Sequence, residues 1–189
     1  MRIIGNDLRP GMVIEHEGKL WRVAKISRSQ REQREAYTQA DLKAVRDGHK
    51  IVARFASSEN VERAHLESKD FQYLYADGDL YTFMDNKTYE QVTVSAETIG
   101  EDQVPYLQEN TVVSIDFHEG VPIAVRLPQT AVLKVVEADA VIKRQTASSS
   151  YKPAVLENGV RTMVPPHIGI GSRIVVNTAD GAYVERAKD

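Results

Sequence analysis

Residues 152–171 read Lys-Pro-Ala-Val-Leu-Glu-Asn-Gly-Val-Arg-Thr-Met-Val-Pro-Pro-His-Ile-Gly-Ile-Gly. Within them, the short apolar run Ala154–Leu156 and the run Val160–Val164 are separated by Asn158 and Gly159. Asn-Gly between two apolar runs is the strongest short-range signal for a β-hairpin, because both residues accept the positive φ of a tight turn. This stretch therefore predicts a hairpin, which two prolines and a glycine-containing turn then connect to a further apolar run at Arg173–Val176.

The same pattern recurs along the chain. An acidic residue or Asn followed by Gly precedes a short run of β-branched and aromatic residues at fairly even spacing. Such repetition is typical of β-sandwiches and β-barrels, and helical periodicity is nearly absent outside a brief stretch near Glu101–Leu107. The sequence therefore predicts an all-β protein. The expected strands include Leu20–Val23, Ile51–Phe55, Leu80–Met84, Pro122–Leu127, Arg161–Val164 and Tyr183–Val184.

Two polar or proline-containing seams divide the 189 residues into three units. One seam is Ser57–Ala64, and the other is Leu127–Thr130, where an X-Pro step favours extended or turn backbone. The resulting units, 1–64, 65–127 and 128–189, have the size of small closed β-barrels. For the two outer units we expect SH3-like or oligonucleotide-binding (OB) barrels, which are both common on nucleic acids.

Composition excludes several classes of protein. The chain has no cysteine, so it has neither disulfides nor a thiolate nucleophile nor a cysteine metal site. No apolar run approaches the roughly 20 residues needed to cross a bilayer, and the first residues do not have the pattern of a signal peptide. We therefore expect a cytoplasmic protein without a membrane partner.

The net charge of −3 is unevenly distributed. Residues 1–64 hold 13 basic and 9 acidic side chains (+4), residues 65–127 hold 3 and 12 (−9), and residues 128–189 hold 8 and 6 (+2). Basic ends suit contacts with nucleic acid, while an acidic middle would be repelled from phosphate or would face protein. Three unrelated solubilised surfaces explain the same charges equally well.

Residues for catalysis or metal binding are not grouped in the sequence. The five histidines are scattered without metal-ligand spacing, and the aspartates at 77, 79 and 85 lack the rest of a calcium loop. No phosphate-binding glycine loop, nucleophile motif or acid–base pair is present. We expect no enzyme, no metal and no cofactor.

Ser27–Arg46 permits two conformations. It holds no Gly or Pro over its first twenty residues, and Glu32–Ala36 are good helix formers, so local propensity slightly favours a polar helix. In that helix Ala36, Tyr37 and Ala40 would share one side. A β-hairpin is the alternative, although the hydrophobic alternation from Ala36 to Val45 is loose.

The two basic ends of the chain contain side chains suited to binding RNA. Arg28, Arg31 and Arg34 are three residues apart, and guanidinium groups bind phosphates and stack on bases. Glu32 and Glu35 would instead neutralise them on a solvated face. In the last unit, the hydroxyl groups of Thr146–Tyr151 could contact RNA, although a plain flexible loop explains this segment equally well. Tyr183 and Arg186 offer a stacking and a charged group, although a buried tyrosine beside a surface arginine explains them better.

Together, these motifs resemble bacterial translation elongation factor P over essentially the whole chain. The resemblance implies an SH3-like barrel followed by two OB barrels in an L-shaped, tRNA-like arrangement. It also implies a monomer that binds the 70S ribosome, its ribosomal RNA and the P-site peptidyl-tRNA, and that contacts messenger RNA at the exit site. Such factors relieve stalling at consecutive prolines by orienting the tRNA, without chemistry of their own. The matching stretches include Gly11–Val23, Val61–Ala64, Phe71–Asp79, Thr146–Ser148, Lys152–Ala154 and Asn177–Arg186.

The chain departs from the family at the hairpin tip of the first barrel. There the family presents a Pro-Gly-Lys-Gly type tip, or a related one with arginine, whose end residue is usually modified and reaches toward the peptidyl-transfer centre. The gap-free correspondence places Arg31, Glu32, Gln33 and Arg34 at this tip, with Gln33 at the modified position. Glutamine cannot take a lysine- or arginine-type modification, so we expect an unmodified tip. The equal length favours a hairpin over the local helix.

A second departure lies in the third barrel. Lys143-Arg144-Gln145 stands where the family usually has Gly-Asp, in the loop that faces the messenger. By resemblance, Arg28, Arg144, Gln145, Thr146, Ser148, Tyr183 and Arg186 are predicted contacts with ribosome or tRNA. Two alternatives remain: a divergent or engineered member that docks without the activity of a modified tip, and a general RNA-binding protein of tandem barrels.

Overall fold

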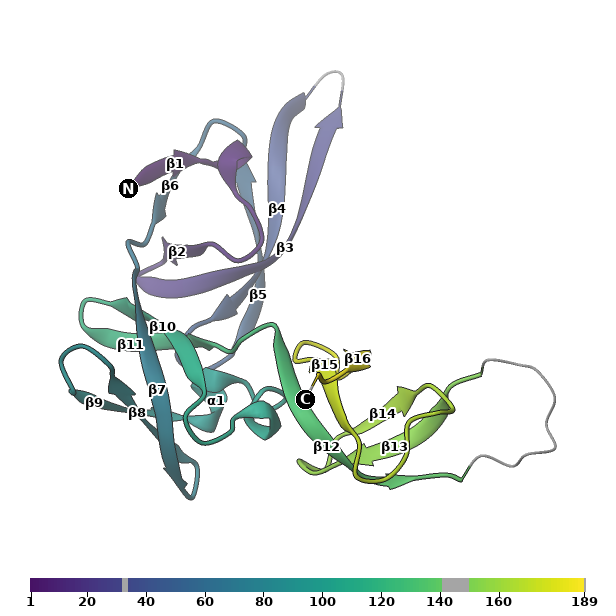
Figure 1. Ribbon diagram of the computed structural model, residues 1–189. Coiled ribbons are helices and arrows are strands. Elements are labelled where there is room, and N and C mark those ends of the chain that lie inside the picture. The colour runs from purple at the N-terminus through teal and green to yellow at the C-terminus, as the bar shows by residue number, and fades with distance from the viewer. Residues whose placement is uncertain (32–33, 141–149, 189) are drawn as a thin grey trace. The chain divides into compact units, whose positions relative to one another are not determined.

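A computed structural model describes residues 1–31, 34–140 and 150–188, with backbone alone at residues 30, 31 and 34 (Figure 1). The described residues form three curled β-sheets and only a few turns of helix. The predicted all-β architecture of small barrels is therefore confirmed.

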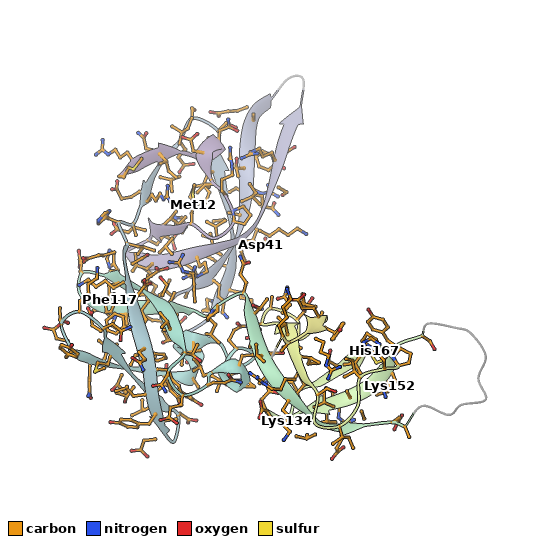
Figure 2. The ribbon with its side chains drawn as sticks, viewed as in Figure 1. Met12, Asp41, Phe117, Lys134, Lys152 and His167 are labelled. Atoms are coloured by element: carbon orange, nitrogen blue, oxygen red, sulfur yellow. The ribbon has the colours of Figure 1, made fainter. Side chains whose placement is uncertain are left out.

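The first sheet has six strands in the order β1-β6-β2-β3-β4-β5. Its core includes Leu8, Ile14, Trp21 and Leu42, and the half-buried Met12 (labelled in Figure 2) packs against this core. One strand, β6, falls inside the predicted seam, because its single buried apolar residue, Val61, is flanked by polar ones. The strands are β1 (Arg2–Ile4), β2 (Val13–His16), β3 (Lys19–Arg31), β4 (Arg34–Ala44), β5 (Lys50–Ala56) and β6 (Asn60–Arg63), with the 3-10 helix η1 (Gly5–Asp7) after β1.

The second sheet has five strands in the order β11-β10-β7-β8-β9. Pro122 lies on the edge strand β11, and edge strands are where sheets accept a proline, which has no N–H to donate. The helix expected near Glu101–Leu107 is instead a turn followed by a 3-10 helix, and a short α-helix precedes it. The elements are β7 (Glu67–Asp77), β8 (Leu80–Asp85), β9 (Gln91–Ser95), α1 (Ala96–Ile99), η2 (Val104–Tyr106), β10 (Val112–His118) and β11 (Val121–Arg126).

The third sheet has the order β14-β13-β12-β15-β16 and contains the predicted hairpin. Its register pairs Lys152 with Val164 and Val155 with Arg161, and Gly159 has φ +83° in the turn. The hairpin predicted from Asn158-Gly159 is confirmed. The strands are β12 (Thr130–Ala138), β13 (Lys152–Leu156), β14 (Arg161–Val164), β15 (Arg173–Asn177) and β16 (Tyr183–Arg186).

Contacts group the chain into two compact units. One comprises Met1–Lys69 and Asp116–Ala124, and the other comprises Asp70–Ile115 and Val125–Asp189. In the second unit, the η2 segment packs on the third sheet: Tyr106 belongs to that sheet's core, and the Asn158 side-chain amide donates to the Pro105 carbonyl at 3.1 Å. The division at residues 64 and 127 stays a prediction.

No helix in the described parts of the chain is long and apolar enough to cross a membrane.

Candidate nucleic-acid interface

The segment Ser27–Arg46 contains most of a long β-hairpin, so the local helix prediction is wrong. Strand β3 pairs with β4 from Trp21 opposite Ala44 to the backbone of Arg31 opposite that of Arg34. Strand β5 covers β4 only between Lys43 and Tyr37, and the Ser57 N–H then donates to the Ala36 carbonyl at 2.9 Å. Beyond that point the two strands continue as an arm outside the sheet (Figure 1).

A two-residue period in β4 explains why this segment forms a strand. Thr38, Ala40, Leu42 and Ala44 are all buried, whereas the residues between them are half-buried or exposed. Such alternation places every second side chain in the core of a barrel, and burial there outweighs helix propensity. Small residues and a threonine make the alternation hard to see, yet it was the available signal.

Arg28, a predicted RNA contact, is exposed on β3 and is tied to the chain before β2. Its Nη2 donates to the carbonyl oxygens of Asn6 at 3.0 Å and Leu8 at 3.3 Å. Arg9 Nη1 donates to the same two oxygens, at 3.0 and 2.8 Å. The structure thus places a second arginine beside Arg28, which sequence reasoning missed because 19 residues separate the two.

On the other face of the sheet, Tyr37 and Arg54 form a cation–π pair. The Arg54 guanidinium carbon lies 5.2 Å from the centre of the Tyr37 ring, and its Nε donates to Gln39 Oε1 at 3.3 Å. Aromatic and guanidinium groups side by side are the chemistry on which nucleic-acid bases stack. Sequence reasoning missed this pair too, because the β4–β5 register that joins them was not predicted.

The tip and the third-barrel loop lie outside the residues whose side chains the structure describes. This applies to the predicted tip residues Arg31, Glu32, Gln33 and Arg34, and to the predicted contacts Arg144, Gln145, Thr146 and Ser148. Near the end of β12 the described chain continues to Ala140, and Lys152 Nζ at the start of β13 donates to the Asp139 carbonyl at 2.7 Å (Figure 2). These eight contacts stay predictions.

Tyr183 and Arg186 lie on β16, the last strand of the third sheet. Tyr183 is half-buried against the core of that sheet, and Arg186 is exposed. The ring of Tyr151, which is 52% exposed, meets the Tyr183 ring edge to face with 6.3 Å between centroids. The structure therefore adds a more accessible aromatic group beside the predicted one.

Charge and protonation add little to this interface. Among the described residues, no group of three or more His, Asp or Glu side chains is placed to hold a metal ion. Burial raises the pKa of Tyr106, with smaller contributions from the carboxylates of Asp180 and Asp102. The pKa of exposed Glu62 is lowered, mainly because its carboxylate accepts a hydrogen bond from the terminal amine of Met1 at 2.6 Å. Neither group lies on the arm.

Known families match each part of the chain. Residues 5–61 match the elongation factor P (EF-P) KOW-like domain, residues 66–125 match the EF-P OB domain, and residues 131–186 match the elongation factor P C-terminal domain.

Relatives match the chain over its full length. Elongation factor P of Zymomonas mobilis is 52% identical over 187 residues, which cover 99% of this chain and 100% of the relative. That of Erythrobacter litoralis is 50% identical with the same coverage. A solved structure of eukaryotic translation initiation factor 5A from Methanococcus jannaschii, at 19% identity, matches the fold with a TM-score of 0.55 over 68% of this chain and 94% of its own. The chain belongs to the elongation factor P family of translation elongation factors.

Proposed function

We propose that this ribosome-associated translation factor binds the 70S ribosome beside the P-site peptidyl-tRNA and speeds peptide-bond formation between consecutive prolines. The observation that carries the proposal is the arm at the end of β3 and β4. It extends past the pairing with β5, so it is free to enter a narrow space while the sheet stays outside. We further propose that the factor is a cytoplasmic monomer with three domains, at 1–64, 65–127 and 128–189.

The mechanism is positioning. Holding a reactant in its attacking geometry lowers the barrier by removing translational and rotational freedom before the reaction, with no proton or group transfer by the factor. On the arm the described side chains are those of Glu35 and Ala36, and the predicted tip adds arginine, glutamate and glutamine. We therefore place the factor among non-enzymatic partners of the ribosome, which supplies the reaction centre itself.

RNA contacts would hold the factor in place. The pair of half-buried Tyr37 and exposed Arg54 offers stacking chemistry on the first sheet. The Tyr151–Tyr183 pair and Arg186 offer the same combination on the third sheet. Ribosomal RNA and the peptidyl-tRNA both present phosphates and unstacked bases that such groups bind.

A shortened arm tests the proposal. A variant in which Asn-Gly replaces residues 30–36 connects Ser29 to its cross-strand partner Tyr37 through a two-residue turn. We expect it to bind 70S ribosomes but to give no increase in full-length product from a reporter that contains consecutive proline codons. The matched control replaces only Glu35 with Gln and keeps the length. Equal rescue by the shortened and full-length chains would refute a role for the arm.

A second candidate is a family member that docks on the ribosome without relieving stalls. It is favoured by Gln33 at the position that the family usually modifies. Full occupancy of ribosomes by the unaltered chain, with no gain in the proline reporter, would support this candidate. Replacing Arg31-Glu-Gln-Arg34 with Pro-Gly-Lys-Gly, in a host that modifies such tips, should then restore rescue.

A further inference from the structure

Arg9 and Arg28 bring two positive charges to one place at the base of the long hairpin. Arg9 Nη1 and Arg28 Nη2 each lie 3.0 Å from the carbonyl oxygen of Asn6. Both nitrogens also donate to the Leu8 carbonyl, at 2.8 and 3.3 Å. Two nitrogens that share an acceptor are no farther apart than twice the length of a hydrogen bond, so these guanidinium groups are neighbours.

In the hydrogen bonds between described residues, each guanidinium leaves some of its donors unused. A guanidinium has five N–H groups, and the contacts above occupy only one terminal nitrogen of each side chain. Arg9 keeps its Nε–H and its Nη2 amino group, which form the edge that binds phosphate or carboxylate with two parallel hydrogen bonds. Arg28 keeps its Nε–H and its Nη1 amino group. Both side chains are exposed, so these donors can reach a ligand.

Among the described residues, neither guanidinium forms an ion pair with an acid. Within the described parts of the chain, no carboxylate oxygen lies within 4.0 Å of either guanidinium. Asp7, the acidic residue next to them in sequence, accepts a hydrogen bond from the Ile4 N–H at 3.2 Å. Like charges at this separation repel each other, and an anion bound by both would remove that repulsion.

We propose that Arg9 and Arg28 form a binding site for one phosphate group of an RNA backbone. The backbone carbonyls hold both guanidinium groups in place before binding, which reduces the side-chain entropy that a phosphate contact otherwise loses. Which RNA occupies the site rests on the proposed function, where it is the RNA of the ribosome or of the peptidyl-tRNA. The site itself requires only a phosphodiester.

The test measures affinity and its dependence on salt. Dissociation constants are determined for a fluorescent RNA hairpin and for 70S ribosomes over a series of potassium chloride concentrations. We expect Arg9→Gln and Arg28→Gln each to weaken binding about tenfold and to reduce the slope of log K against log salt by about one. Arg161→Gln, on β14 of the third sheet, removes the same charge elsewhere and serves as the control.

Several outcomes separate the site from a structural role and from the proposed function. Affinities and slopes equal to those of Arg161→Gln would overturn the site, even if the thermal midpoint falls. If the substitutions weaken ribosome binding but leave RNA binding unchanged, the two arginines bind an acidic protein of the ribosome, and the proposed phosphate site is also overturned. Normal Arg-dependent RNA binding without ribosome binding would leave the site standing and remove the proposed function.

A measurement on the unaltered chain covers the case in which the variants do not fold. Phenylglyoxal modifies accessible arginines, and peptide mass spectrometry reports the extent at Arg9 and Arg28. We expect the RNA hairpin to protect both residues and to leave Arg161 reactive. Equal modification of Arg9 and Arg28 with and without RNA would contradict the proposal.

Discussion

The long hairpin β3–β4 and the short hairpin β13–β14 reach similar backbone pairing by different means. The short one has Asn158-Gly159 at its turn, with Gly159 at φ +83°, so its geometry is encoded within a dozen residues. The long one has neither Gly nor Pro near its tip, and β5 pairs with the other side of β4 from Tyr37 to Lys43. Its base is therefore specified by residues distant in sequence.

This difference matches the roles that we propose for the two hairpins. The short hairpin is part of a scaffold: both of its strands contribute to the core, and its turn is held by the Pro105 carbonyl. The long hairpin combines a buried base with a polar arm, so its base can be stable while its tip varies. If the short hairpin is specified by its own turn and the long hairpin by residues distant in sequence, substitutions in the two should affect stability in different ways.

The largest effect is expected from the core under the long hairpin. Leu42 is 1% exposed on β4, and Leu42→Ala should lower the free energy of unfolding by about 2–5 kcal/mol, through lost burial and the cavity left behind. Urea denaturation measures this change. Leu80→Ala, at a leucine that is 51% exposed on β8, should change stability by no more than about 0.5 kcal/mol. Equal losses of stability from the two substitutions would show that the buried core does not support this hairpin.

The next effect concerns the turn of the short hairpin. Gly159→Ala places a Cβ at φ +83°, which should cost about 1–2 kcal/mol. Gly169→Ala is the matched control, because its φ is outside the left-handed region and no atom lies within 4 Å of the added Cβ. There, a less flexible unfolded chain should leave stability unchanged or raise it by about 0.4–1 kcal/mol. Equal losses at both glycines would show that the Asn-Gly turn does not specify the hairpin.

Replacing Thr38 or Thr162 with valine should change the stability of the protein in opposite directions. Thr38 on β4 is fully buried, and within the described structure its hydroxyl has no hydrogen-bond partner, so Thr38→Val should raise stability by about 1 kcal/mol. The hydroxyl of Thr162 on β14 donates to the Gly181 carbonyl at 2.6 Å, so Thr162→Val should lower stability by about 1 kcal/mol. Thermal and urea unfolding measure both. A loss at Thr38 would mean that its hydroxyl is paired in solution.

The smallest effect is a pH dependence at the site where the short hairpin packs on η2. Burial raises the pKa of Tyr106 above its ordinary value near 10, so the folded state holds this proton at pH values where the unfolded state has released it. Its contribution to stability is therefore complete below about pH 10 and is lost as pH rises through the raised pKa. Tyr106→Phe should flatten the alkaline part of the profile of thermal midpoint against pH. An unchanged alkaline slope would exclude Tyr106 as its source.

Sequence alone predicted the fold where turn chemistry and apolar runs coincide. Every expected strand after an acidic-Gly or Asn-Gly turn is present, because these turns specify hairpins locally. It did not predict β6, with its single buried Val61, or the helical segments near Tyr106 in their observed bounds. Arg54 over Tyr37 was missed because strand register brings them together, and register depends on the whole sheet. Arg9 beside Arg28 was missed because the chain before β2 and strand β3 are distant in sequence, yet both side chains donate to the carbonyls of Asn6 and Leu8.

The central claim is that the factor accelerates peptide transfer through its arm. The direct measurement is the rate of a single Pro–Pro peptide bond on purified 70S ribosomes saturated with the unaltered chain, with the variant carrying Asn-Gly in place of residues 30–36, or with no factor. We predict that the unaltered chain increases this rate and that the shortened chain leaves it at the value without factor. An unchanged rate at full occupancy by the unaltered chain would contradict the claim.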